Sequence, residues 1–167
     1  MPESALISKQ KSNCRAQLDF FVGMAKDILE KHGEFRPVFY LEKKPDGVAI
    51  VFPDFHDDES KDSSIAHIMS MLKQFDSDYF IHAAEAWVIQ RKPEDKVERP
   101  MFAKDRRDAL MVTYNQRDGK MVEVTLLFRK GKCGKIFFDE PTEKYSGFGK
   151  GDDFKTCSGR FALLRSW

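Results

Sequence analysis

Apolar and polar residues alternate along the chain from Tyr79 to Glu140, in runs separated by Asp118-Gly119 and by the turn sequence of residues 131–134. Alternation with a period of two predicts strands, and short Gly-containing breaks between such runs predict tight reversals of the chain. The pattern therefore predicts an antiparallel meander with strands at 79–90, 106–117, 120–129 and 135–139.

Two helices and a hairpin are predicted before this meander. Apolar residues recur at helical spacing over 12–32, with Gly33 as the C-terminal cap, and over 63–75, with Asp62 or Ser63 as the N-terminal cap. The β-rich runs 37–41 and 48–52 are joined by a turn containing Pro and Gly. The order α-β-β-α-β-β-β, with a further C-terminal strand at 160–167 as an option, predicts an α+β fold. Its antiparallel sheet has about five or six strands, and both helices are expected on one face.

The chain is expected to fold as one domain. Residues 1–11 are predicted to be a flexible N-terminus, 12–140 the α+β domain, and 141–167 a Gly- and Lys-rich segment that docks on the same domain. The charged, Pro-containing stretch 91–105 has no periodicity and indicates a long loop within the domain.

Composition narrows the class of protein further. The 28 basic and 27 acidic residues nearly cancel, so no overall charge attracts nucleic acid or anionic lipid. Three scattered cysteines do not form a disulfide framework, and no apolar run is long enough to span a bilayer. The sequence predicts a cytoplasmic protein with no membrane partner.

The turn Asp118-Gly119 predicts which residues pair across the central hairpin. A two-residue turn places Arg117 opposite Lys120, and this register puts four residues on one face that is apolar in its middle: Leu110, Val112, Tyr114 and Leu127. An apolar sheet face with a charged rim is typical of an interaction surface. The leading hypothesis is a non-catalytic interaction or assembly module without a cofactor, which binds another copy of itself or another protein through this face.

A second hypothesis is a metal-dependent hydrolase. Carboxylates and imidazoles of the acidic loop 54–62 and of the following strand supply ligands suited to a divalent metal that activates water. The candidate ligands are Asp54, His56, Asp58 and His82. Acidic residues before a helix are also favoured by capping, and His82 also fits a core position, so both alternatives stay open.

A third hypothesis is a single-stranded nucleic-acid binder, because aromatic and basic residues alternate near the C-terminus. The candidate residues are Lys144, Tyr145, Phe148, Lys150, Lys155 and Arg160. The alternative is a loop pinned to the domain by its aromatic side chains. Cys133 lies among Lys130, Lys132 and Lys135, which favour a thiolate, but no base is apparent in the sequence.

Three segments resemble a known group of proteins. These are Glu85-Ala86-Trp87, the Pro-containing basic loop after it, and the run from Arg107 to Val112 that leads to Asp118-Gly119. Together they resemble a small group of uncharacterised bacterial and phage-associated proteins, over about half of the chain. The resemblance implies an α+β fold and a mobile-element setting, and it supplies no activity or site.

Overall fold

The computed structural model describes residues 2–89, 94 and 102–149. It has the predicted α+β class and the predicted order of elements from the first helix to the meander. The helices are α1 (Glu3–His32) and α2 (Asp58–Gln74), and a short 3-10 turn, η2, covers Lys132–Gly134. The strands are β1 (Val38–Glu42), β2 (Val48–Val51), β3 (Tyr79–Val88), β4 (Arg107–Gln116), β5 (Met121–Lys130), β6 (Ile136–Phe138) and β7 (Thr142–Ser146).

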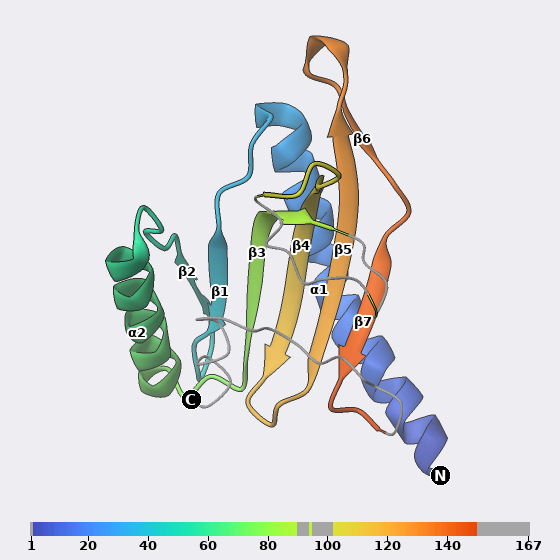
Figure 1. Cartoon of the computed structure of the whole chain (residues 1–167). Coiled ribbons are helices and arrows are strands. Elements are labelled where there is room, and N and C mark those ends of the chain that lie inside the picture. Colours follow the sequence, from blue (N-terminus) through green and yellow to red (C-terminus); the bar gives the residue numbers. More distant parts are fainter. Residues whose placement is uncertain (1, 90–93, 95–101, 150–167) are drawn as a thin grey trace.

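All seven strands belong to one antiparallel sheet in the order β2-β1-β3-β4-β5-β6, and β7 pairs with β5. The long strands β3, β4 and β5 form its centre. Figure 1 shows α1 behind these central strands and α2 beside the β1–β2 end of the sheet. The hairpin β1–β2 therefore forms one end of the sheet.

The two helices pack on opposite faces of the sheet, so the prediction that both lie on one face is wrong. Val38 and Tyr40 of β1 belong to the core beneath α1, whereas Phe39 and Leu41 belong to the core with α2. Successive residues of a strand point to opposite faces. All four side chains are buried, because β1 is covered on both sides.

Both helices begin earlier than predicted. α1 starts at Glu3, so residues 3–11 are helical and the predicted flexible N-terminus is wrong for them. Ile7 packs against the core that contains Phe148, which gives this first part of the helix an apolar contact. α2 starts after Asp57, whose carboxylate accepts from the Ser60 N–H at 2.7 Å while the Ser60 hydroxyl accepts from the Asp57 N–H. This reciprocal capping box, rather than Asp62 or Ser63, defines the start of α2.

The central hairpin has a register one residue different from the predicted one. The Gln116 N–H donates to the Lys120 carbonyl and the Gly119 N–H donates to the Gln116 carbonyl. The loop therefore has three residues, with Gly119 at a φ of 88°. As a result Leu110 lies opposite Leu126 and Tyr114 lies opposite Val122. A one-residue change of register also changes which residues of the two strands share a face.

The segment after β6 is only partly the loop expected from the sequence. Residues 142–146 form β7, so the predicted boundary at 140 divides one sheet. Arg15 of α1 donates to Glu143 of β7 at 2.5 Å, and Phe148 is buried in the core beneath α1. The predicted strand at 160–167 lies outside the described residues.

Candidate functional site

The predicted interaction face is covered in the folded protein. Leu110, Val112 and Tyr114 are at most 3% exposed and belong to the core beneath α1. Leu127 pairs with Ala109 and so lies on the other face of the sheet. The assignment of these four residues to one exposed face is wrong, because the register is shifted by one residue and because α1 covers the first three.

The largest row of exposed apolar side chains in a strand lies instead along β2. Val48 is 52% exposed, Ile50 is 57% exposed, and Phe52, which follows the strand with the same parity, is 69% exposed. Val48 and Ile50 pair with Glu42 and Tyr40, which places them on the α1 side of the sheet. We call Val48, Ile50 and Phe52 the β2 row.

The β2 row is exposed because α1 does not extend over β2. The outermost contacts of α1 in this direction reach Tyr40 of β1: the Phe21 and Tyr40 rings are 4.6 Å apart, and the Tyr40 hydroxyl is 4.0 Å from the Met24 sulfur. Beyond Tyr40, no described helix covers Ile50. The opposite side of β2 is different, since Ala49 and Val51 are partly buried against the α2 core.

The backbone of β2 also has groups that point away from the sheet. The Lys43 N–H donates to the Gly47 carbonyl at 3.0 Å, so this pair is hydrogen-bonded across the hairpin. In an antiparallel ladder such pairs alternate with pairs whose N–H and C=O groups point outwards. The pairs Glu42–Val48 and Tyr40–Ile50 are of the second kind. Val48 and Ile50 therefore direct their backbone groups to the free edge, where β2 has no neighbouring strand among the described residues.

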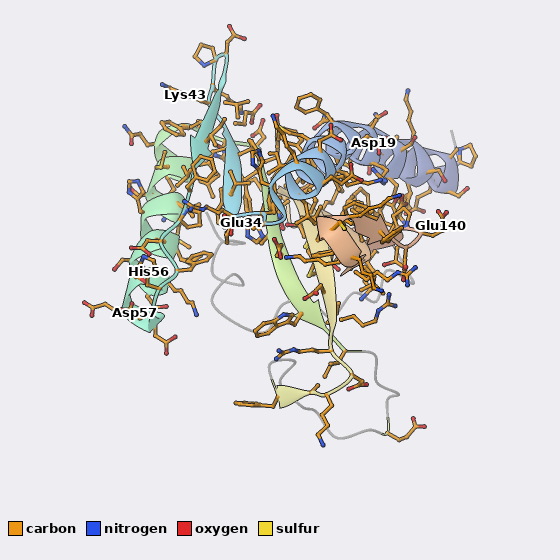
Figure 2. The ribbon with its side chains drawn as sticks, turned by 90° about the horizontal axis from the view of Figure 1, so that it is seen from above. Asp19, Glu34, Lys43, His56, Asp57 and Glu140 are labelled. Carbon is orange, nitrogen blue, oxygen red and sulfur yellow. The ribbon has the colours of Figure 1, made fainter. Side chains whose placement is uncertain are left out.

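The four predicted metal ligands do not come together. His82 is on β3, with its ring stacked on Phe39 at 4.4 Å in a partly buried position, whereas His56 is exposed beside Asp54 at 3.2 Å. Within the described part of the chain, no group of three or more His, Cys, Asp or Glu side chains is placed to hold a metal ion. The neighbouring Asp57 instead caps α2, as the capping alternative predicted. Figure 2 shows His56 and Asp57 at the end of the hairpin remote from Lys43.

The predicted nucleic-acid residues are also divided. The Tyr145 hydroxyl donates to Glu143 at 2.7 Å, and its ring packs edge-on against Phe148 at 5.9 Å. Both rings contact the α1 core, so they act as packing groups rather than as an open stacking platform. Lys144 points to the other face, opposite Glu123. Lys150, Lys155 and Arg160 lie outside the described residues.

Cys133 is exposed in η2 with a φ of 61°, in the turn between β5 and β6. Exposure is required of a nucleophile, but a nucleophile also requires a positioned base. The structure supplies no observation that gives this thiol a catalytic role.

A polar row crosses the sheet on the face away from α1, and the sequence did not reveal it. The register aligns His82, Thr113, Glu123 and Lys144 across four neighbouring strands. Glu123 is 4% exposed, and burial raises the pKa of its carboxyl group, while Lys144 and a 3.2 Å hydrogen bond from Thr125 oppose that rise. Burial lowers the pKa of His82 to about 4. Two ionisable groups in one row whose pKa values are shifted by desolvation make the stability of the protein dependent on pH.

The stability of the protein should fall on mild acidification, and His82 should cause part of that fall. Its pKa is below the ordinary value of 6.5 in the folded state, so the unfolded state binds the proton first as pH decreases. The contribution is present above pH 6.5 and is lost towards pH 4, with a cost of about 2 kcal/mol by pH 5. Chemical denaturation of the wild type and of His82→Phe at pH 7.5 and pH 5 measures it.

The difference between the two proteins is the informative quantity. Glu123 acts with the opposite sign, because its raised pKa favours the folded state as pH decreases, and it acts equally in both proteins. The phenylalanine keeps a ring against Phe39. An equal loss of stability in the wild type and in His82→Phe between pH 7.5 and pH 5 would contradict the assignment.

None of the helices within residues 2–89, 94 and 102–149 combines the length and the apolarity needed to cross a membrane. No family model, no curated protein and no solved structure matches this chain.

The sequence contained one signal for the β2 row. Residues 48–52 are all apolar, although a strand with one exposed face normally alternates. The hairpin was predicted correctly, but an apolar strand at the edge of the sheet could be distinguished from one in the middle only when the strand order was known.

Proposed function

We propose that this protein is a non-catalytic assembly module that associates through the edge of its sheet at β2. The observation that supports this proposal is the coincidence of two features at one strand. The residues of β2 that direct their backbone groups outwards also carry the exposed apolar side chains. An open strand of this kind binds another strand through main-chain hydrogen bonds, and its side chains add apolar contact.

A comparison with the other edge strands supports β2 as the contact. β6 has only three residues, and the ring of Phe137 lies 5.1 Å from the Arg129 guanidinium and 5.2 Å from the Lys135 ammonium. β7 carries Glu143 and Lys144 and follows Pro141. Short length, charged residues and proline protect edge strands from association. β2 has no charged residue and no proline within Val48–Val51.

The proposed contact surface differs from the interaction face that the sequence predicted. The contact is a sheet edge with its exposed row, not the face formed by Leu110, Val112 and Tyr114, which α1 covers. The metal and nucleic-acid hypotheses lose support for a related reason, since the described members of each candidate set are separated or engaged in packing.

Association through β2 should not be weakened by salt. The row contributes apolar contact and backbone hydrogen bonds, and screening weakens only attraction between charges. Light scattering over a range of protein concentrations, at about 0.05 M and about 1 M sodium chloride, should show a mass that rises above 19.4 kDa with concentration at both.

Two results would contradict this proposal. A mass of 19.4 kDa at every concentration would show that the chain does not associate with itself. Association that disappears at the higher salt concentration would indicate an interface of ion pairs, and that interface would have to be elsewhere on the surface.

A further inference from the structure

The pattern of β2 restricts the strand that can pair with it. An added strand must offer outward-directed backbone groups opposite Val48 and Ile50, because these are the residues of β2 whose backbone groups point to the edge. It must also place apolar side chains beside the β2 row, which is on the α1 side of the sheet. These are two independent conditions, and β2 itself satisfies both.

We propose that the occupant of this edge is a second copy of the chain, paired antiparallel about a two-fold axis at Ile50. This inference rests on the proposed function, which is tested by self-association, and adds the register and the symmetry of the pairing. Ile50 lies opposite Ile50 of the second copy, and Val48 lies opposite Phe52 of the second copy. The interface is isologous, since each copy contributes the same residues.

This register is selected by hydrogen bonding and by apolar contact together. A shift of one residue would place Ile50 opposite Ala49 or Val51, whose backbone groups point to β1 of their own chain. A shift of two residues in either direction would leave one member of the β2 row without an apolar neighbour. Only the register centred on Ile50 pairs all three positions.

The surroundings of β2 accommodate the second copy. α2 packs on the side of the hairpin opposite the β2 row, over Phe39 and Leu41 of β1 and against Ala49 and Val51 of β2. A two-fold axis normal to the sheet keeps both α1 helices on one side and both α2 helices on the other. Asp46 and Asp54 lie just beyond the paired residues, where each would face the other, so the ladder is limited to residues 48–52.

The test is disulfide formation between single cysteines in the β2 row. Serine replaces Cys133 and Cys157 in every variant, and the buried Cys14 is kept. Ile50→Cys should form a covalent dimer under mild oxidation, because opposed residues in an antiparallel ladder have Cα atoms about 5 Å apart. Val48→Cys alone and Phe52→Cys alone should not, because each is about 14 Å from its own equivalent at 3.4 Å per residue. An equimolar mixture of Val48→Cys and Phe52→Cys should form a mixed dimer.

The three positions have similar exposure, so each variant is a control for the others. Covalent dimers of Ile50→Cys and of the mixture, with none from Val48→Cys or Phe52→Cys alone, support the inference. Equal cross-linking of Val48→Cys alone and of the mixture would overturn the register while the assembly function remained. The absence of any cross-link from a protein that is dimeric by light scattering would place the interface elsewhere and overturn the inference. A protein that is monomeric by light scattering would overturn the inference and the proposed function together.

Discussion

Tyr114→Glu is expected to unfold the protein rather than to dissociate it. Tyr114 is 3% exposed, and its ring stacks on Tyr79 at 5.1 Å beneath α1. Burial raises the pKa of its hydroxyl group to about 12, which reflects how poorly this position tolerates a negative charge. The substitution removes a packed ring and introduces a carboxylate, at a combined cost of about 4 kcal/mol or more. Stabilities of domains are about 5 to 15 kcal/mol, so this loss is a large fraction of the total.

Circular dichroism and thermal melting measure this effect, with an expected decrease of the midpoint by about 10 °C or more. Tyr114→Phe is the matched control, because it keeps the ring and loses only the 3.3 Å hydrogen bond from Gln116. That variant should lose about 1 kcal/mol. A Tyr114→Glu protein with a normal melting transition and a reduced mass in solution would instead support an exposed interface at β4.

Ile50→Lys is expected to yield a monomer with an unchanged fold. Each copy contributes three apolar side chains to the proposed contact, and their burial contributes about 10 kcal/mol in total when both copies are counted and burial is partial. Association costs about 4 to 15 kcal/mol, so the net gain at the lower end of this cost is about 6 kcal/mol, a modest affinity with a dissociation constant of tens of micromolar. A lysine at the two-fold axis would place two ammonium groups directly opposite each other and would remove two central apolar contacts. Dissociation should therefore be complete at concentrations where the wild type is dimeric.

The control for Ile50→Lys is Phe137→Lys on the opposite edge strand, β6. Phe137 is 40% exposed, and cations already flank its ring. This variant should keep the mass of the wild type. If both substitutions reduced the mass equally, the effect would come from added charge in general and not from the β2 edge.

The elements of the fold were predictable to different degrees from the sequence, and β1 shows why. Its apolar residues are consecutive rather than alternating, which indicates a strand buried on both faces. This feature, applied to the packing of the helices, would have predicted one helix on each face. The alternation of the later strands, which is typical of a sheet with one covered face, does not apply to β1.

The central hairpin shows a second limit. Asp118-Gly119 correctly predicted the position of the turn. The loop has three residues instead of the predicted two, and its third residue, Gly119, adopts a left-handed conformation. The predicted two-residue turn put Leu127 on the same face as Tyr114, whereas the three-residue loop puts Leu127 on the opposite face. Local sequence specifies where such a chain reverses more strongly than it specifies the register.

The polar row and the β2 row depend on contacts that are distant in sequence. His82, Thr113, Glu123 and Lys144 become neighbours only through the pairing of four strands. The exposure of the β2 row similarly depends on the extent of α1, which ends its contacts at Tyr40. Neither arrangement has a local motif, so the residue types alone could not identify it.

Sedimentation equilibrium of the wild type and of Ile50→Lys, measured together at about 1 mM, tests the central claim most directly, since this concentration far exceeds a dissociation constant of tens of micromolar. We expect a wild-type mass close to twice the 19.4 kDa of the chain and a mass of 19.4 kDa for Ile50→Lys, with the same circular dichroism spectrum for both. A monomeric wild type, or a variant that remains as associated as the wild type, would contradict assembly through β2.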